Sequence, residues 1–508
     1  MLGNRALRFG SLLEVVRAEP ARPLVGLTWA LNHAISGLLP WSYHLLNVVV
    51  HAVNAALASQ LLLWIGRRRG LRDPERAAML GGALFAVSPM AAETVAYVSS
   101  RSTAIASGFV LAGLLNAVPL LEAPTRRRWL AALALACLGL LAKEEAASLP
   151  LLLLLLDYFF VAGQSARGVA RRWRVHATFL ALPLLGLAAR AFVTGAWLPA
   201  PAMGRRRYLA TQLALYPEYV LRTLIPVDPA FYRGHEAAAW PPAAWMVAGW
   251  LGTLLLATLA VVGRRRWPLA AFGLAWLAAA LLPSSSLLPL KEMLVDHRAY
   301  LGGLGLVALV AAGLALLPGQ RLAPVLLGLL ALVALRYQWV LGSPVRAWQD
   351  AVSRAPDAAE AWLALGDSYF ASGDPRAEPA LREALKLAPA DPTGWVNLGA
   401  FLAERGRLEE ASEAMKRASR LSPADARLHD NLATLYRSLG RHAEVLAELE
   451  AAVAGQPPLT QPRVRLASLL IASGDRARAA RLLDEAARIG PDPEEAQQIL
   501  SLQRELGR

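Results

Sequence analysis

Repeated apolar runs between residues 24 and 341 constrain the fold of this chain more than any other feature. Each run is about 15–23 residues long, the length that an α-helix needs to cross a bilayer core. The chain is 56% hydrophobic with a mean hydropathy of +0.38, which is unusual for a soluble protein of 508 residues. After about residue 345 the runs stop and charged residues recur regularly. We therefore predict an all-α chain, with a polytopic membrane helix bundle followed by a charged domain.

The apolar runs predict about ten membrane-spanning helices. Between the sixth and seventh runs, residues 207–226 include Pro217, Glu218 and Arg222. Full exposure of these residues to lipid is costly, so we expect an interfacial or re-entrant helix there. The expected spans lie near residues 43–65, 77–90, 102–120, 129–142, 146–161, 175–193, 243–262, 267–283, 299–317 and 323–341.

Arginine clusters predict the orientation of these spans. The formal net charge of +14 comes from the part of the chain before residue 351, and the arginines gather at the ends of apolar runs. We interpret this as a topology signal and expect no nucleic-acid partner, with the clusters facing the cytoplasm. An even number of spans lets all of them do so, near residues 66–76, 125–129, 166–174 and 263–267.

This orientation places residues 1–42 and the end of the last span on the extracytoplasmic side. Residues 1–42 contain no signal-peptide pattern. A further span upstream would explain this orientation, and insertion of residues 24–39 into the membrane is the alternative. The first of these is the expectation that we favour.

A repeat begins at residue 359. Gly406, Gly440 and Gly474 recur with the tetratricopeptide period of 34 residues, and Pro423, Pro457 and Pro491 do the same. Each such unit is a pair of antiparallel helices, and stacked units form an α-solenoid that commonly binds other proteins. We expect a linker at 342–358, four repeats at 359–493 and a capping helix at 494–508.

The first expected span carries a stripe of polar residues, His44, Asn47, His51 and Asn54. Their spacing of three to four residues places them on one side of a helix. Polar groups are costly in lipid, so the stripe should face the interior of the bundle. It could form hydrogen bonds between helices or line a polar cavity, and the sequence leaves both open.

Charged residues also gather in three segments between spans, which the topology places on one extracytoplasmic face. Cations beside carboxylates suit a substrate with a phosphate or diphosphate head. Ordinary charges at helix ends would give a similar pattern. The residues concerned are Glu93 and Arg101; Lys143, Glu144 and Glu145; and Asp296, His297, Arg298 and Tyr300.

Several kinds of site are not indicated. No phosphate-binding glycine loop, nucleophile elbow or metal-binding helix motif occurs, which argues against an ATP-driven pump. The single cysteine, Cys137, lies in an apolar run and cannot build a disulfide framework or a cysteine zinc site. No metal ligand is assigned and no cofactor is certain, although a divalent metal remains open.

Four membrane segments resemble, in order, the transmembrane and tetratricopeptide-repeat O-mannosyltransferase family and its bacterial relatives. Two of them read ALFAVSPMAAETVAYVSSRS and SLLPLKEMLVDHRAYLGGLGL. This family belongs to the GT-C glycosyltransferases, which transfer a sugar from a polyprenyl-phosphate carrier to a hydroxyl, in animal members Ser or Thr of a protein. The four segments are 21–57, 83–102, 142–158 and 286–306.

The resemblance implies roles for several residues. Arg298, His297, Arg101 and Tyr300 would bind the donor phosphate, and Asp296 and Glu93 would have a polar or metal-binding role. The repeats would present the acceptor protein. The polar-cavity candidates are Asp296, His44, Asn47, His51, Lys143, Glu144 and Glu145.

The catalytic base stays unassigned. In GT-C enzymes an acidic residue in the first outer loop has this role, and the family's acidic pair is not found here. Glu14 and Glu19 are the carboxylates before residue 73, and with Glu93 they are weak candidates. The chain also carries Ser88, Ala91 and Thr103 where relatives commonly have two histidines and an aspartate.

Two hypotheses follow. The first is a glycosyltransferase of the bacterial inner membrane, with its repeats in the periplasm, that moves a sugar (mannose is one candidate) to a protein Ser/Thr or another hydroxyl. The second is a non-catalytic membrane scaffold whose repeats bind a periplasmic partner. A transporter ranks third, because the spans show no internal symmetry.

Overall fold

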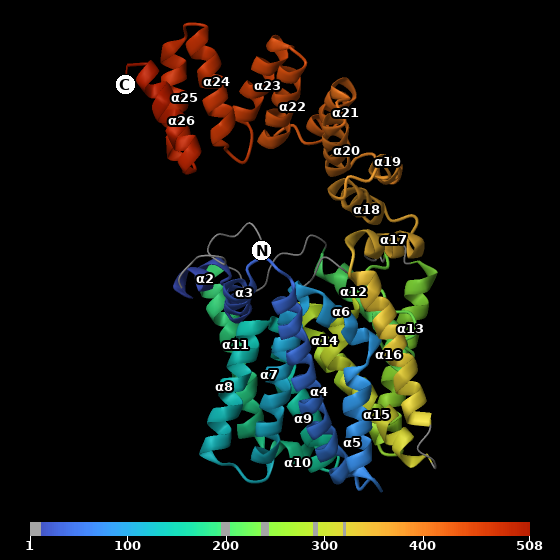
Figure 1. Ribbon diagram of the computed structural model, residues 1–508. Helices are drawn as coiled ribbons and strands as arrows, with labels where there is room; N and C mark the ends of the chain where they lie inside the picture. The colour runs from blue at the N-terminus through green and yellow to red at the C-terminus, as the bar shows by residue number, and fades with distance from the viewer. Residues whose placement is uncertain (1–11, 195–203, 235–242, 288–292, 318–321, 508) are drawn as a thin grey trace. The chain divides into compact units, whose positions relative to one another are not determined.

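The computed structural model describes residues 12–194, 204–234, 243–287, 293–317 and 322–507. The described residues form helices and connecting turns, and no β-strand occurs among them. The all-α prediction is thus confirmed. The chain divides into two compact units, Met1–Ser343 and Pro344–Arg508 (Figure 1).

The first unit is a bundle of helices joined by short turns. Short helices occur within its connections: η1 (Val98–Ser100), η2 (Val118–Leu121), η3 (Glu144–Ser148), η4 (Asp157–Val161), η5 (Pro283–Leu287) and η6 (Asp296–Arg298). Its α-helices are α2 (Leu12–Ala18), α3 (Pro23–Ser36), α4 (Trp41–Arg69), α5 (Pro74–Ala86), α6 (Pro89–Ala96), α7 (Arg101–Ala117), α8 (Arg126–Ala142), α9 (Leu149–Leu156), α10 (Ala166–Ala170), α11 (Trp173–Thr194), α12 (Arg205–Leu224), α13 (Ala244–Gly263), α14 (Pro268–Leu282), α15 (Ala299–Leu316) and α16 (Leu322–Leu341).

Six helical stretches in the described part of the chain are long and apolar enough to cross a membrane. A seventh is possible if α5 and α6, which meet at a bend of 52°, form one broken span. The expected spans near 129–142, 146–161 and 175–193 fall on α8, α9 with η4, and α11. Helix α8 has 17 residues and starts with three arginines, and α9 has 8, so neither reaches the required apolar length, whereas α11 has 22 residues and is apolar over Trp173–Ala188.

Two further expectations can be compared with the helices. The 20-residue helix α12, where an interfacial or re-entrant helix was predicted, is not among the six candidate spans. The alternative expectation, that residues 24–39 cross the membrane, would need a helix long enough to span the bilayer. Helix α3 has 14 residues, fewer than the roughly 20 that a span needs.

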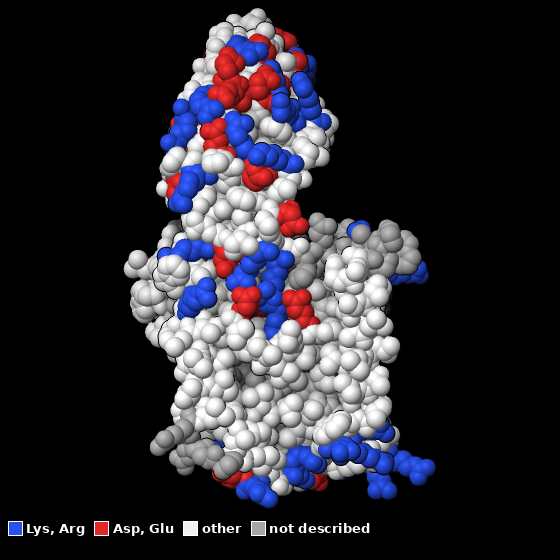
Figure 2. All heavy atoms as spheres, turned by 90° about the vertical axis from the view of Figure 1, so that its right-hand side faces the viewer, with Lys and Arg blue, Asp and Glu red and all other residues white. Residues whose placement is uncertain are grey.

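The arginine-rich loops meet at one end of the first unit. Arg68 forms an ion pair with Glu122, and the Nε of Arg172 donates to the carbonyl oxygen of Leu121 at 2.8 Å. Gln164 Nε2 donates to the carbonyl oxygen of Arg264 at 2.7 Å. These contacts join the four loops in which the arginine clusters lie, and we call this the arginine end. Figure 2 shows a broad belt of uncharged surface between this end and the charged opposite end.

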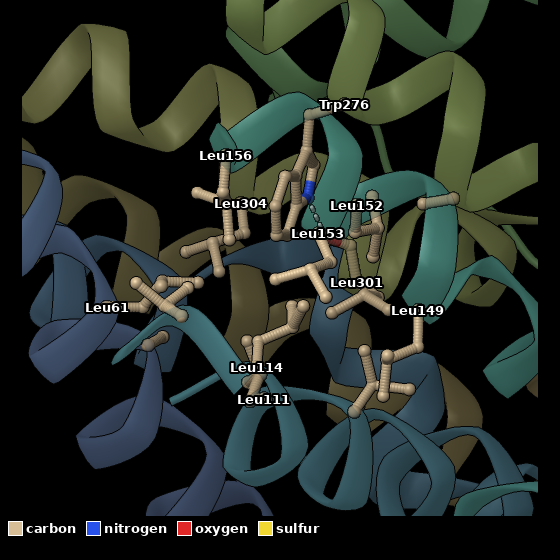
Figure 3. Packing of buried hydrophobic residues seen from close by; sticks show 14 of the residues in the cluster. Leu61, Leu111, Leu114, Leu149, Leu152, Leu153, Leu156, Trp276, Leu301 and Leu304 are labelled. Carbon is tan, nitrogen blue, oxygen red and sulfur yellow. Dashed lines mark hydrogen bonds between the residues drawn. The ribbon is translucent and has the colours of Figure 1, made fainter. Parts of the chain in front are cut away.

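Leucines from several helices fill the core of the bundle around Trp276 (Figure 3). The indole Nε1 of Trp276 in α14 donates to the carbonyl oxygen of Leu301 in α15 at 3.0 Å. A methyl group added at Gly305 would lie 2.7 Å from Trp276 Cβ, so α14 and α15 touch where α15 has no side chain. Small residues allow the same close contacts between membrane helices in general.

The second unit contains four helix pairs. At the end of each first helix, Gly373, Gly406, Gly440 or Gly474 adopts a positive φ between 71° and 89°, which explains the glycine period. The helices are α17 (Pro344–Arg354), α18 (Ala359–Ala371), α19 (Ala377–Leu387), α20 (Pro392–Glu404), α21 (Leu408–Leu421), α22 (Ala426–Ser438), α23 (His442–Ala454), α24 (Thr460–Ala472), α25 (Arg476–Arg488) and α26 (Pro493–Glu505).

Both ends of the repeat array are helical. The expected linker at 342–358 instead contains α17, which packs on α18 because Ala347, Ala351 and Val352 give it a buried face. At the other end, α26 lies within the expected capping segment. It starts with a capping box in which Asp492 and Glu495 each bind the other's backbone N–H.

Candidate functional site

The charged segments between expected spans come together at the end of the first unit opposite the arginine end. Helix α8 runs from Arg126, beside the arginine-rich loops, to Ala142, so Lys143 lies at this opposite end. Here α6 packs against η6, and η3 packs against η5. The cluster that results, which we call the His297 cluster, consists of Glu93, Lys143, Glu145, Asp296, His297 and Arg298.

Glu93 and His297 form a two-point contact across 204 residues of sequence. Glu93 Oε1 lies 2.8 Å from His297 Nδ1, and the backbone N–H of His297 donates to Glu93 Oε2 at 3.3 Å. An ionised carboxylate only accepts hydrogen bonds, so the proton of this pair sits on Nδ1. His297 Nε2 has no hydrogen-bond partner within the described ranges, and the side chain is 18% exposed. Glu93 therefore orients an imidazole whose other nitrogen is available to a ligand.

Asp296 is held from two sides and is almost fully buried. Its Oδ1 lies 3.3 Å from Arg222 Nη1, and its Oδ2 accepts from the backbone N–H of Ala230 at 3.0 Å. Arg222 also donates to Glu218 Oε1 at 2.8 Å, within α12. These bonds engage both oxygens of Asp296, which suits a residue that fixes η6 in place.

Arg298 points into the protein beside α12. Its Nη1 donates to the carbonyl oxygen of Met293 at 3.2 Å and lies 3.5 Å from the hydroxyl of Tyr208. Tyr208 in turn donates to the carbonyl oxygen of Ser284 in η5 at 2.6 Å. The side chain of Arg298 is buried.

Lys143 and Glu145 form a buried ion pair next to these cations. Lys143 Nζ lies 2.9 Å from Glu145 Oε1 and donates to Thr103 Oγ1 at 2.7 Å. Burial raises the pKa of the Glu145 carboxyl, but Lys143, followed by His297 and Arg298, outweighs burial and holds that pKa below its usual value. Glu145 thus stays ionised at neutral pH, and Thr103, which departs from the family pattern, has a partner.

Arg101, expected at the donor phosphate, is fully buried among neutral acceptors. Its Nε donates to Asn47 Oδ1 at 2.7 Å, its Nη1 to Asn32 Oδ1 at 2.6 Å and Thr28 Oγ1 at 3.2 Å, and its Nη2 to the carbonyl oxygen of Tyr43 at 2.8 Å. Arg101 therefore ties α7 to α3 and α4. With all three nitrogens engaged, it is placed to hold these helices rather than to meet a phosphate.

Tyr300 is also engaged inside the bundle. Its hydroxyl lies 2.7 Å from His51 Nδ1 and accepts from Asn54 Nδ2 at 3.0 Å. His51 Nε2 bonds the carbonyl oxygen of Ala86 at 3.0 Å, which adds α5 to the network. Asn47, His51 and Asn54 are buried, as the stripe predicted, and they make bonds between helices. His44 differs, because it is exposed in the first turn of α4.

The remaining carboxylate candidates lie outside the His297 cluster. Glu144 forms an ion pair with Arg22 at 3.0 Å. Glu14 is exposed on α2, and Glu19 follows this helix half-buried. In the described part of the chain, no hydrogen bond or ion pair joins Glu19 to the His297 cluster.

The described residues offer no ligand set for a metal ion, because no three His, Cys, Asp or Glu side chains among them come close enough to hold one. The described carboxylates of the His297 cluster bind His297, Lys143 and Arg222 instead. The His297 cluster therefore places an imidazole, a guanidinium and an ammonium beside three carboxylates.

An apolar groove of about 370 Å³ lies between α12, α13 and α14 and is linked to the cluster. Gln212, which lines this groove, donates from Nε2 to the carbonyl oxygen of Met293 at 2.7 Å. Tyr219, also in its wall, accepts from the backbone N–H of Val295 at 3.4 Å. Leucines and alanines make up most of the remaining lining. Gln212 and Tyr219 thus line the apolar groove and also bind the backbone of the segment that precedes η6.

Sequence reasoning missed Arg222, Tyr208 and Gln212 as parts of this site. All three lie on α12, where Glu218 and Arg222 had indicated an unusual helix. Their partners at 284, 293 and 296 are 74 or more residues away in the chain. The polar residues on α12 indicated that this helix does not simply face lipid, but they did not indicate which residues they bind.

Comparisons with known proteins give partial matches. A family described as the C-terminal domain of cilia and flagella-associated protein 70 matches residues 322–502. Protein O-mannosyl-transferase TMTC2 of Mus musculus is 39% identical over 94 residues, 18% of this chain and 10% of that protein. TMTC3 of Mus musculus is 42% identical over 95 residues, with 19% and 10% covered. The chain therefore spans about a tenth of the length of these relatives.

Solved structures match with low similarity. MamA is 21% identical, with a TM-score of 0.27, over 31% of this chain and 89% of that one. YrrB, a tetratricopeptide protein, is 19% identical, with a TM-score of 0.27, over 36% and 92%. This chain is thus a protein with several apolar helices and a helical repeat unit that is similar, over part of its length, to protein O-mannosyl-transferases.

Proposed function

We propose that this chain is a membrane glycosyltransferase that moves a sugar from a polyprenyl-phosphate carrier to a hydroxyl group, such as Ser or Thr of a protein. The observation that carries the proposal is the His297–Glu93 pair. It presents His297 Nε2 in a cluster that also holds Lys143 and Arg298, and two residues that line an apolar groove also support the segment before His297. A phosphate head and an isoprenoid tail need this combination of a cationic site and an apolar site.

In the proposed reaction, the acceptor oxygen attacks the anomeric carbon and the bond from that carbon to the phosphate oxygen breaks. The electron pair of this bond leaves with the polyprenyl phosphate, which gains negative charge. Protonated His297, which donates from Nε2, and Arg298 stabilise this charge. Glu93 acts through His297, because both of its oxygens already bind that residue. The acceptor proton passes to a base that we do not assign.

The location follows from the arginine end. Loops rich in arginine stay in the cytoplasm, so the His297 cluster at the opposite end would face the extracytoplasmic side. For a bacterial chain this is the periplasmic side of the inner membrane. An even number of spans would put the repeat unit on that same side, where it would bind the acceptor protein.

A scaffold without catalysis is the second candidate. Arg101, Tyr300 and Asp296 have their polar atoms engaged within the protein, as in a structure that only needs stability. In that case the bundle would serve as an anchor and the repeats would bind a periplasmic partner.

The experiment uses the full chain in lipid nanodiscs with polyprenyl-phosphate mannose and a Ser/Thr-containing acceptor peptide, and it follows sugar transfer by mass spectrometry. His297→Ala and Arg298→Ala should each lower transfer by about 10²-fold, as expected for loss of charge stabilisation. Arg265→Ala, an exposed residue at the arginine end, is the control and should transfer normally. If the unaltered chain transfers no sugar from any polyprenyl-phosphate donor, the scaffold hypothesis is favoured.

A further inference from the structure

The repeat unit contains a groove of about 510 Å³, lined by α22, α23, α24 and α26. We call it the basic groove, because Arg437, His442 and Arg465 line it and no Asp or Glu does. Its apolar lining includes Leu469, which is 42% exposed and thus open to a ligand. The groove lies entirely within the second unit.

Several N–H groups of the basic side chains in this groove have no hydrogen-bond acceptor within residues 344–507. Arg465 Nη1 donates to Asp430 Oδ1 and to Thr434 Oγ1, both at 2.9 Å. Within 344–507, the Nε and Nη2 of Arg465 donate to no other residue. The side chains of Arg437 and His442 form no hydrogen bond or ion pair in the same range. The Nε–Nη2 edge of a guanidinium binds a carboxylate with two parallel hydrogen bonds.

The repeat fold does not require these charges. At the position of Arg437, the other three repeats have Phe370, Ala403 and Ile471. At the position of Arg465 they have uncharged residues, Ala364, Asn397 and Asn431. Because the same helix pair forms without a cation at either position, Arg437 and Arg465 are not needed for packing.

The two positions equivalent to Arg437 and Arg465 carry no cation in the first two repeats. In the first repeat the equivalent of Thr434 is Asp367, which accepts a hydrogen bond from Asn397 at 2.6 Å. The second repeat carries the exposed Glu404 one residue after Ala403. Like charges repel a ligand and opposite charges attract it, so a negatively charged ligand favours the third and fourth repeats over the first two.

We propose that the basic groove binds an acidic segment of a partner protein that also carries an apolar side chain. Carboxylates of the segment would meet the free edge of Arg465 and the side chains of Arg437 and His442. An apolar side chain between them would cover Leu469. The proposal does not depend on sugar transfer, since either an acceptor protein or a scaffold partner can carry such a segment.

The test measures fluorescence anisotropy of a labelled 12-residue peptide of alternating Glu and Leu, with the full chain in a neutral maltoside detergent. Peptides of Ser and Leu, and of Lys and Leu, serve as comparisons. The Glu-Leu peptide should bind at least tenfold more tightly than either, and its binding should weaken with salt. Equal binding of the three peptides would overturn the proposal.

Two variants locate the binding site. Arg437→Glu should weaken binding of the Glu-Leu peptide at least tenfold, and Leu469→Ser should weaken it about threefold. Arg481→Glu makes the same charge change at an exposed position of α25 that does not line the groove, and it should bind as the unaltered chain does. If Arg437→Glu and Arg481→Glu weaken binding equally, the peptide is responding to overall charge or to the arginine end, and the proposal is wrong. Because Arg437 and Leu469 are exposed, unchanged circular dichroism spectra should accompany both variants.

Discussion

The two units use charged residues in different ways. In the His297 cluster of the bundle, charged side chains are buried beside their partners, as Lys143 is beside Glu145 and Thr103. In the repeats, most ion pairs are exposed and several join residues three or four apart, such as Glu378 and Arg382. A buried pair is costly to break, since one charge then stays without compensation, whereas an exposed pair contributes little. Ion pairs of the same residue types therefore contribute very differently to the free energy of unfolding in the two units.

Lys143→Met should show the largest effect. It removes the partner of the buried Glu145, which should lower the free energy of unfolding by about 3–5 kcal/mol. The measurement is the melting temperature of the detergent-solubilised chain by scanning fluorimetry. The double variant Lys143→Met with Glu145→Leu should recover much of the loss. A melting temperature unchanged by Lys143→Met would show that the pair does not matter for stability.

A smaller effect is expected from Gly305→Ala. The added Cβ would lie 2.7 Å from Trp276 Cβ, so α14 and α15 must separate, at a cost of about 1–3 kcal/mol. Gly313→Ala is the matched control on the same helix, because no atom lies within 4 Å of its added Cβ. The first variant should lower the melting temperature and the second should not. Equal melting temperatures would contradict the close contact.

The smallest effect should come from Glu378→Gln in the repeats. Burial is the largest single influence and raises the pKa of Glu378, but the hydrogen bonds from Arg382 and Arg407 together outweigh it and lower that pKa. A lowered pKa in the folded state means that the pair stabilises the fold above the usual pKa of Glu and that this contribution is lost as the pH falls. At pH 7 the variant should lose at most about 1 kcal/mol of unfolding free energy, and this difference from the unaltered chain should shrink as the pH falls through the lowered pKa. A loss as large as that of Lys143→Met would remove the contrast between the units.

Periodic patterns predicted the fold well. The 34-residue period fixed the helix pairs, because glycine is needed wherever the chain leaves the first helix with a positive φ. The stripe in α4 was correctly expected to be buried, apart from His44. The number of spans stays a prediction, because length and composition identify six described helical stretches as candidates and do not decide the role of the shorter α8 and α9.

The site was harder to predict, because a residue's partner decides its role. Glu93 and His297 were both singled out in the sequence, but nothing in it shows that they bind each other across 204 residues. Arg101 looked suited to a phosphate, yet it donates to Thr28 and Asn32 of α3 and to two acceptors of α4. Arg222 could be read as a polar residue in an apolar helix, but not as the partner of Asp296.

Helix α12 connects the apolar groove mechanically to the residue beside His297. Its Gln212 and Tyr219 stand in the wall of the apolar groove, and one turn beyond Tyr219 its Arg222 grips Asp296, the residue next to His297. A long apolar molecule in the groove would push α12 away from α13 and strain the contact between Arg222 and Asp296. An empty groove would leave this contact unstrained. Under the proposed function, the tail of the donor lipid would fill the apolar groove, so its binding would act through Arg222 and Asp296 on the orientation of the His297 imidazole.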